Sequence, residues 1–240
     1  MQSNQRSRYS RPQTGRKPVS PSTKLNDNLR SAFTEEGIDE YLYSLLPARD
    51  PVVTEMEDYA AQHNVPIIGP AVARLIALQV MISGAKRIFE MGSAIGYSTI
   101  WIARAAGPKA EVFYTDGDPE NAKRATDHFR RAGVAKRIRI QTGDALDLLK
   151  KSRGSFDLIF CDVNKDQYPA ALRVAVPKLR RGGLFIADNT LWSGKVSREA
   201  ASNDSNTRSI QQFNQLIYDT PGLFPVLLPL RDGVTLCRKL

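Results

Sequence analysis

Short apolar runs alternate with longer helical patterns through most of the chain, and this alternation constrains the fold more than any other feature. Runs that predict strands lie at residues 87–91, 111–115, 137–141, 156–161 and 184–187. The patterns between them predict helices near residues 98–106, 119–132, 145–150 and 166–179. Because a helix that joins two strands of one sheet forms a crossover between parallel strands, five parallel strands are expected.

The C-terminal part of the chain has a different pattern. After a predicted helix at residues 205–218, two apolar runs at 224–230 and 234–239 are joined through Arg231-Asp232-Gly233. An Asp-Gly pair between two apolar runs is a strong signal for a β-hairpin. The predicted fold is therefore α/β: a Rossmann-like, doubly wound sheet of seven strands, mostly parallel with a C-terminal antiparallel hairpin, and with helices on both faces.

Three further helices are predicted before the first strand. The first begins near residue 33 and stops at Pro47, and the third spans residues 70–82. The second starts where Asp50 can cap a helix and Pro51 suits its first position, and it ends near Asn64. We expect these helices to form an N-terminal cap on a single domain of residues 34–240.

The formal charge of +9 is concentrated at the N-terminus. Residues 1–30 contain seven Lys and Arg residues against Asp27 alone, so they account for +6 of it. This segment has almost no large apolar residues and cannot bury enough surface to offset the entropy of ordering. We therefore predict a disordered basic tail over residues 1–33 that acts as a solubilising extension. An RNA-binding arm and an Arg- and Ser-rich targeting segment are the alternative interpretations.

The sequence predicts a soluble, cytoplasmic protein with no membrane partner. No stretch approaches the roughly 20 consecutive apolar residues of a membrane-spanning helix, and the N-terminus lacks the apolar centre of a secretory signal. The two cysteines, Cys161 and Cys237, each lie within an apolar run. Packing is the expected role for both, rather than a disulfide or a metal site, and this fits a reducing compartment.

A glycine-containing loop follows the first predicted strand and has the sequence Glu90-Met91-Gly92-Ser93-Ala94-Ile95-Gly96-Tyr97-Ser98. Glycines allow a sharp turn and close approach to a ligand, and free amides at a helix start favour an anionic group. The spacing differs from the G-x-G-x-x-G pattern of dinucleotide-binding loops, which argues against NAD. We expect a ligand with a carboxylate in place of a pyrophosphate, to which Ser98 can donate a hydrogen bond.

Acidic residues follow the second and third predicted strands. Asp116 can accept hydrogen bonds from both hydroxyls of a ribose, and Asp144 with Ala145 lies at the level expected for an adenine edge. Either aspartate can instead be a simple helix cap. Because ligands of an open α/β sheet bind at the carboxyl ends of its strands, the three segments together favour a cofactor that contains a nucleoside.

Oxygen-bearing side chains follow the fourth and fifth predicted strands. Asp162 comes directly after residues 156–161, and Asp188-Asn189 follow residues 184–187. Side by side at neighbouring strand ends, they form a hard oxygen set that suits Mg²⁺, or Ca²⁺ or Mn²⁺, and leaves positions for water or substrate oxygens. The alternative interpretation is local hydrogen bonding, because Asp and Asn are also favoured at turns and caps.

Lys165 favours the functional interpretation of this segment. It lies near the start of the predicted helix 166–179, where a cation faces the positive end of the helix dipole. That helix end and a nearby metal would both disfavour the charged ammonium, which predicts a role as general base. A solvated surface lysine is the alternative interpretation.

These motifs resemble those of the cation-dependent O-methyltransferases, the family that includes catechol and caffeoyl-CoA methyltransferases. The resemblance extends from about residue 35 to the C-terminus. It also includes the segments Asp188-Asn189-Thr190-Leu191-Trp192-Ser193-Gly194 and Asp232-Gly233-Val234-Thr235-Leu236. It implies the fold of the class I methyltransferases, S-adenosylmethionine as cofactor and one divalent metal.

The resemblance matches individual residues to roles. Glu90, Gly92, Gly96 and Ser98 match the cofactor loop, Asp116 the ribose position, Asp162, Asp188 and Asn189 the metal triad, and Lys165 the catalytic lysine. Together, the resemblance and the residues at the predicted strand ends give one set of predicted cofactor-binding residues. They are Glu90, Gly92, Ala94, Gly96, Ser98, Asp116, Asp144, Ala145 and Asp162. One departure is visible: this chain has Asp162-Val163-Asn164-Lys165 where many family members have Asp-Ala-Asp-Lys. We therefore do not count Asn164 as a charged metal ligand.

The predicted function is methylation of a hydroxyl on a catechol-like or hydroxycinnamoyl small molecule, because two adjacent oxygens can chelate a metal. Tyr168 and Trp192 are candidates for the wall of the substrate site, although either can equally belong to the core. Methylation of a 5-hydroxyuridine in tRNA is the alternative function, motivated by the basic tail. A non-catalytic protein that binds S-adenosylmethionine is a third hypothesis. The resemblance also implies a homodimer.

Overall fold

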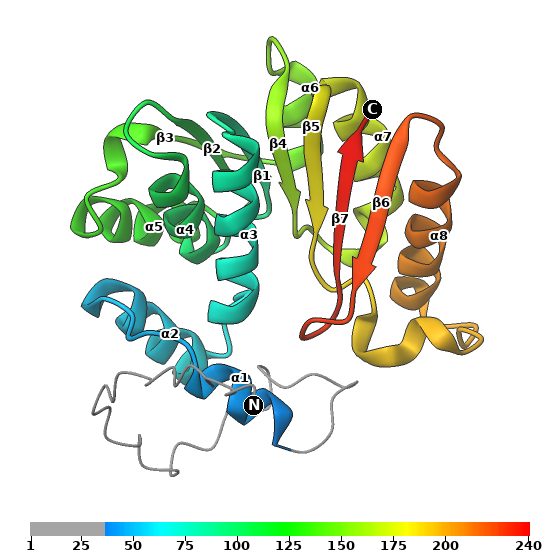
Figure 1. Cartoon of the computed structure of the whole chain (residues 1–240), viewed down its shortest axis with the longest axis horizontal. Helices are drawn as coiled ribbons and strands as arrows, with labels where there is room; N and C mark the ends of the chain where they lie inside the picture. Colours follow the sequence, from blue (N-terminus) through cyan, green and yellow to red (C-terminus); the bar gives the residue numbers. More distant parts are fainter. Residues whose placement is uncertain (1–36) are drawn as a thin grey trace, which may run out of the picture.

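The computed structural model describes residues 37–240, and its central feature is one seven-stranded sheet (Figure 1). The strands are β1 (Arg87–Met91), β2 (Glu111–Asp116), β3 (Ile138–Thr142), β4 (Phe156–Cys161), β5 (Leu179–Ala187), β6 (Leu223–Leu228) and β7 (Val234–Lys239). Their order is β3-β2-β1-β4-β5-β7-β6, with β1 to β5 parallel and β7 antiparallel to both of its neighbours. This confirms the predicted fold class. The predicted disordered tail, residues 1–33, lies outside the described residues.

Hydrophobic side chains extend from both faces of the sheet and form one core on each face. Along β4, Leu158 and Phe160 join one core, whereas Ile159 and Cys161 join the other, as the two-residue period of a strand requires. The helices over the first core are α2 (Pro51–His63), α3 (Gly69–Ser83), α4 (Tyr97–Ala106) and α5 (Pro119–Arg131). Those over the second are α6 (Ala145–Lys151), α7 (Tyr168–Lys178) and α8 (Ser205–Asp219). Strands buried on both faces explain the continuous apolar runs in the sequence.

The N-terminal helices follow their capping signals. The Asp50 carboxylate accepts hydrogen bonds from the backbone N–H groups of Val52 and Val53 at the start of α2. Asn64 ends this helix in the left-handed conformation, with φ of 53°. A short helix, α1 (Ile38–Ser44), precedes it. Within residues 37–240, no helix is both long and apolar enough to cross a bilayer.

The fifth strand is longer than the sequence predicted. It begins at Leu179 rather than at residue 184, and it contains Gly182 and Gly183 where the register against β4 shifts. A Cβ on Gly183 would lie 2.9 Å from the carbonyl oxygen of Arg180, so the irregular backbone needs a glycine there. A polar, glycine-rich segment is typical of a turn, which is why residues 180–183 did not look like a strand.

Both cysteines have the predicted packing role. Cys161 lies in β4 and Cys237 in β7, and both are buried free thiols. Burial raises the pKa of the Cys161 thiol to about 12 and that of Cys237 to about 11. Neither thiol is therefore activated as a nucleophile at neutral pH.

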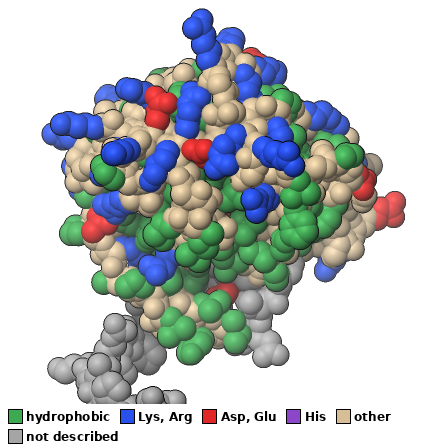
Figure 2. All heavy atoms as spheres, turned by 45° about the horizontal axis from the view of Figure 1, so that its top comes forward, with side chains coloured by type: hydrophobic (Ala, Val, Ile, Leu, Met, Phe, Trp, Pro, Cys, Tyr) green, Lys and Arg blue, Asp and Glu red, His purple; other side chains and the backbone are tan. Residues whose placement is uncertain are grey.

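Lys and Arg side chains gather at the edge of the sheet where the parallel strands begin, which is turned toward the viewer in Figure 2. Several of them bond to carbonyl groups at helix ends. Lys178 Nζ donates to the carbonyls of Lys150 and Ser152 at the end of α6, and Lys239 Nζ donates to those of Val176 and Leu179 at the end of α7. The crossovers place helix C-termini at this edge, so cations satisfy free carbonyls and face the negative ends of helix dipoles.

We expect Gly233→Ala to destabilise the protein by more than about 2 kcal/mol. Gly233 has φ of +87°, and a Cβ there would lie 2.5 Å from the backbone nitrogen of Leu191. Unfolding in urea measures the loss. Gly222→Ala is the matched control, because Gly222 has φ of +79° but no atom within 4 Å of its Cβ position. Equal losses in the two variants would show that only the backbone conformation matters.

Candidate active site

A cleft of about 920 Å³ opens at the edge of the sheet where the parallel strands end. Loops after all five parallel strands contribute to its lining. The predicted residues on this lining are Gly92, Ala94, Asp116, Asp144, Ala145, Asp162, Lys165, Asp188, Asn189 and Trp192. Six aspartates line the cleft against two cationic side chains, Lys165 and Arg231. The cleft therefore has a negative potential that favours cationic ligands.

The loop after β1 is held against the ends of two neighbouring strands. Gly92 has φ of +81°, and a Cβ there would collide with the carbonyl group of Asp162 after β4. The backbone N–H of Ala94 donates to Asp116 Oδ2 at the end of β2, at 2.9 Å. Ala94 itself has φ of 44°, which is uncommon for a residue other than glycine. At Gly92 and Ala94 the loop therefore presents mainly backbone to the cleft, so a ligand can approach it closely.

The two aspartates expected at the nucleoside differ in their local roles. Asp144 caps α6, because its Oδ1 accepts from Asp147 N–H at 2.9 Å, and it also lines the cleft. Asp118, not Asp116, caps α5. Asp116 Oδ1 accepts from the N–H of Asp118 and from the side-chain amide of Asn121. The cap interpretation is therefore right for Asp144 and wrong for Asp116.

Three residues predicted to bind the cofactor do not reach the lining of the cleft: Glu90, Gly96 and Ser98. A Cβ on Gly96 would lie 2.5 Å from the ring of Phe129, so Gly96 serves the packing of the loop against α5. Glu90 is completely buried, and the hydroxyl of Thr99 donates to its Oε2. Burial raises the pKa of Glu90 to about 7, although hydrogen bonds from Ser98 and Thr99 act in the opposite direction. These residues therefore stabilise the loop from its buried side and not from the side that faces the cleft.

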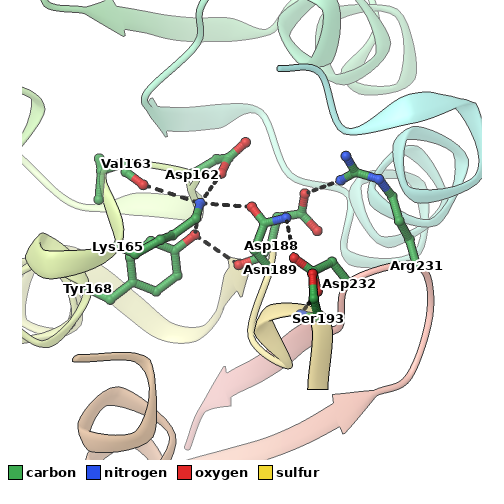
Figure 3. Close-up of polar contacts among 9 residues, drawn as sticks. All are labelled: Asp162, Val163, Lys165, Tyr168, Asp188, Asn189, Ser193, Arg231 and Asp232. Atoms are coloured by element: carbon green, nitrogen blue, oxygen red, sulfur yellow. Dashed lines mark hydrogen bonds and ion pairs between the residues drawn. The ribbon is translucent and has the colours of Figure 1, made fainter. Parts of the chain in front are cut away.

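The candidate metal residues lie at the tips of β4 and β5. Cys161 pairs with Ala187 in parallel register, and the N–H of Asp188 donates to the carbonyl of Cys161 at 3.2 Å. The next residues, Asp162 and Asp188, therefore leave the two strands at the same level. Figure 3 shows the side chains of Asp162 and Asn189 bonded to Lys165, and the carboxylate of Asp188 bonded to Arg231.

Lys165 joins two of these side chains directly. Its Nζ donates to Asp162 Oδ1 at 2.9 Å and to Asn189 Oδ1 at 2.8 Å, and it lies 3.1 Å from the hydroxyl of Tyr168 (Figure 3). The side chain is only 13% exposed, so the interpretation as a solvated surface lysine is wrong. One ammonium within hydrogen-bond distance of both oxygens means that Asp162 and Asn189 converge on a common point.

Asp188 has a buried carboxylate oxygen that is available to bind a cation. Its side chain is 1% exposed, and its Oδ1 is buried without a hydrogen-bond partner among the described residues. Burial raises the pKa of Asp188, and the neighbouring Arg231 guanidinium opposes this rise. A buried carboxylate oxygen without a donor is costly unless something binds it. The oxygens of Asp162, Asp188 and Asn189 fit a hard divalent cation.

Asp232 orients the amide of Asn189. The side-chain NH₂ group of Asn189 donates to Asp232 Oδ2 at 3.3 Å, so its Oδ1 faces Lys165. The backbone N–H of Ser193 donates to the other oxygen of Asp232. Asp232 thus fixes both the side chain of Asn189 and the chain that follows it. The sequence identified this residue only as part of a hairpin turn and of a family signature, and it gave no signal for the position of Arg231 in the cleft.

Tyr168 and Trp192, the candidates for the substrate wall, have different environments. Tyr168 is completely buried and packs edge-on against Phe213, so its assignment to the wall is wrong. Its hydroxyl donates to the carbonyl of Asp188 at 2.8 Å and accepts from Lys165, which makes it a support for the lysine. Trp192 does line the cleft, and its ring centre lies 5.9 Å from Lys165 Nζ.

Comparison with known proteins identifies the family. A profile described as O-methyltransferase matches residues 47–240. The chain belongs to this O-methyltransferase family. A catechol O-methyltransferase of Niastella koreensis is 32% identical over 188 residues, which cover 76% of this chain and 85% of that protein. A caffeoyl-CoA O-methyltransferase of Mesembryanthemum crystallinum is 28% identical over 229 residues, which cover 88% of this chain and 89% of that protein.

Solved structures agree with this O-methyltransferase assignment. An O-methyltransferase from Bacillus cereus in complex with SAH matches with a TM-score of 0.77 and 30% identity, over 85% of this chain and 97% of that one. The match confirms the fold that the resemblance implied. The roles of individual site residues in this O-methyltransferase are not tested by these comparisons and stay predictions.

We expect Glu90→Gln to make the free energy of unfolding less dependent on pH. The folded protein keeps the Glu90 proton up to about pH 7, whereas the ordinary pKa is 4.5, so the folded state binds more protons between these values. Stability therefore falls as pH rises through this window, by at most about 1.4 kcal/mol per pH unit for one group. Urea unfolding at pH 5 and pH 7 should give a smaller difference in the variant.

The exposed carboxylate of Glu199 provides the control for this prediction. Glu199→Gln makes the same chemical change at an exposed position but should leave the pH dependence as it is in the unmodified protein. A pH dependence in Glu90→Gln that equals that of the unmodified protein would contradict the raised pKa of Glu90.

Proposed function

We propose that this protein is an S-adenosylmethionine-dependent O-methyltransferase that uses one divalent metal ion and methylates a hydroxyl of a catechol-like or hydroxycinnamoyl small molecule. The observation that carries the proposal is the arrangement at the tips of β4 and β5. There, Lys165 Nζ lies within 2.9 Å of Asp162 Oδ1 and Asn189 Oδ1, and the buried Asp188 follows directly on β5. Family membership supplies the reaction class.

The cleft supports S-adenosylmethionine as the cofactor. When bound, this cofactor supplies a methyl group from a positively charged sulfonium. The acidic lining of the cleft favours such a cation. Asp116 lies where a ribose is expected, and the backbone of Gly92 and Ala94 borders the same space. The related Bacillus cereus enzyme in complex with SAH, the product left after methyl transfer, agrees with this proposal.

The residues proposed to hold the metal are Asp162, Asp188 and Asn189. When bound, a divalent cation supplies Lewis acidity that favours ionisation of a substrate hydroxyl. Asp188 Oδ1, buried without a partner among the described residues, supports this assignment. Asp232 holds the Asn189 amide so that its oxygen, the only atom of that group able to bind a cation, faces the cleft.

Lys165 is proposed to accept the proton of the substrate hydroxyl, a step in which its side chain acts as the neutral amine and becomes the ammonium. Its Nζ is held in place by Asp162, Asn189 and the hydroxyl of Tyr168. Because Tyr168 also donates to the carbonyl of Asp188, the lysine and the acidic side chains are fixed relative to one another. A base that is held in position reduces the entropy cost of bringing the reacting groups together.

The acidic cleft favours small substrates over RNA. Six aspartates on the lining would repel the phosphates that flank each nucleotide of a polynucleotide on both sides. The Lys and Arg cluster of the described residues lies at the opposite edge of the sheet (Figure 2). The basic N-terminal tail that motivated the tRNA hypothesis lies outside the described residues, so methylation of a hydroxylated tRNA uridine stays an alternative prediction.

Two further hypotheses from the sequence are a non-catalytic cofactor-binding protein and the homodimer that the resemblance implied. A non-catalytic protein would not need the arrangement around Lys165, which argues against a role in cofactor binding alone. A homodimer agrees with several exposed apolar side chains, Leu78, Met81 and Ile82 on α3 and Phe224 and Val226 on β6. Such side chains are frequent at interfaces between subunits.

We expect Lys165→Ala to lower kcat by roughly 10²- to 10⁴-fold, the range for loss of a general base. Binding of S-adenosylmethionine, measured by calorimetry, should change little, because the role proposed for Lys165 is toward the substrate hydroxyl and not toward the cofactor. Lys151→Ala, at the exposed C-terminal end of α6, is the control and should keep full activity. Equal turnover in Lys165→Ala and the unmodified protein would remove the base assignment.

Transfer of a labelled methyl group tests the proposed function itself. With Mg²⁺ present, catechols and caffeoyl-CoA should be methylated, and treatment with EDTA should abolish transfer until the metal is restored. Hydroxylated tRNA is the parallel substrate that tests the alternative function. Full activity in EDTA would contradict the metal, and methylation of tRNA alone would contradict the small-molecule substrate.

A further inference from the structure

Arg231 is a cationic residue in an uncommon backbone conformation next to the proposed metal residues. It lies in the turn between β6 and β7 and has φ of 53°, in the left-handed region that an arginine adopts rarely. Within the same turn, Gly233 has φ of +87° and suits it without strain. A strained position held by a long charged side chain suggests that the side chain serves a purpose there.

The side chain of Arg231 enters the cleft and reaches Asp188. Its Nη1 donates to Asp188 Oδ2 at 3.1 Å, and the guanidinium side chain is only 13% exposed (Figure 3). Lys165 forms the corresponding pair with Asp162 at 2.9 Å. Each of the two acidic side chains is therefore paired with its own cation.

We infer that Arg231 is an internal counter-cation that stabilises the metal-free protein and weakens the binding of a divalent metal at Asp162, Asp188 and Asn189. The inference rests on the metal site of the proposed function, and it adds a residue that sets the affinity of that site. The sequence of the loop alone gave no indication of this role.

The physical reason is the permanent charge of the guanidinium. Arginine does not lose its proton in proteins, so its charge remains when a metal arrives. A divalent cation that binds Asp188 would then lie close to a second positive charge, on a side chain that is only 13% exposed and therefore poorly screened by solvent. Without the metal, the same guanidinium neutralises a carboxylate that is 1% exposed and would otherwise be buried unpaired. Arg231 therefore has opposite effects on the two states.

A purely structural role makes a different prediction. If Arg231 only oriented Asp188, its removal would leave the carboxylate misplaced, and both metal affinity and stability would fall. If Arg231 is a counter-cation, its removal lowers the stability of the metal-free protein but strengthens metal binding. The sign of the change in metal affinity separates the two roles.

The experiment compares Mn²⁺ binding and thermal unfolding in the unmodified full chain, Arg231→Gln, Arg231→Lys and Arg181→Gln. Each protein is freed of metal with EDTA and dialysed, and Mn²⁺ binding is followed by electron paramagnetic resonance and calorimetry. Arg231→Lys keeps the charge, and Arg181→Gln removes an exposed arginine at the opposite edge of the sheet. If Arg231→Gln does not fold, Arg231→Gly gives the same metal measurement, because glycine accepts the left-handed conformation.

We expect Arg231→Gln to bind Mn²⁺ at least about tenfold more tightly than the unmodified protein. Its metal-free form should unfold at a lower temperature, and Mn²⁺ should raise that temperature by more than in the unmodified protein. Arg231→Lys and Arg181→Gln should each stay within about threefold of the unmodified Kd, a margin that ordinary surface charges can account for.

The outcomes separate this inference from the proposed function. Equal or weaker Mn²⁺ binding in Arg231→Gln, with clear binding in the unmodified protein, would overturn the role of Arg231 and leave the proposed metal site intact. The same tightening in Arg181→Gln would also overturn it, because net charge would then explain the effect. Absence of Mn²⁺ binding in every variant at millimolar concentration would overturn both the inference and the proposed metal site.

Discussion

The candidate site depends on the backbone register between neighbouring parallel strands. The N–H of Asp188 donates to the carbonyl of Cys161, and the N–H of Asp162 donates to the carbonyl of Met91. These two hydrogen bonds continue the ladders of the sheet by one residue beyond the strand ends, so both aspartates leave the sheet at the same level. A slip of one residue would turn either side chain to the opposite face of the sheet, away from the other.

The C-terminal hairpin completes this site as well as the sheet. Its turn accepts hydrogen bonds from the chain that follows β5: the N–H of Thr190 donates to the carbonyl of Gly233, and the N–H of Leu191 donates to that of Asp232. The close approach requires a glycine at position 233. It brings the carboxylate of Asp232 to Asn189 and the guanidinium of Arg231 to Asp188. An antiparallel hairpin thus supplies two charged groups to a site otherwise built by parallel strands.

Opposite charges lie at the two edges of the sheet for a common reason. Every crossover helix starts near the ends of the parallel strands and finishes near their beginnings, so the helix dipoles are aligned. At the cleft, Asp118 and Asp144 cap the starts of α5 and α6. At the other edge, Lys178 and Lys239 bond to the carbonyls at the ends of α6 and α7. This polarity makes the cleft acidic and keeps the basic surface away from it.

The sequence by itself determined the fold class and most of the residues that meet at the cleft. Apolar runs such as residues 156–161 are bounded by Asp and Gly, and the rule that ligands bind at the ends of parallel strands then brings Asp162, Asp188 and Lys165 together. The extent of β5 could not be predicted, because residues 180–183 lie at an irregularity in the pairing with β4 that a polar, glycine-rich sequence does not reveal. Local patterns predict strands well where the strand is buried on both faces, because its sequence is then a continuous apolar run.

Only the tertiary structure decided which side chains face the cleft. Tyr168 and Trp192 both follow a strand and both are aromatic, yet Tyr168 packs against Phe213 in the core whereas Trp192 lines the cleft. Gly96 belongs to the cofactor loop in sequence, but it contacts Phe129 of α5. Arg231 is more than 40 residues from Asp188 along the chain and meets it through the hairpin. The carboxyl ends of the parallel strands are marked by local sequence, whereas the direction of a side chain depends on packing between distant segments, which no local pattern encodes.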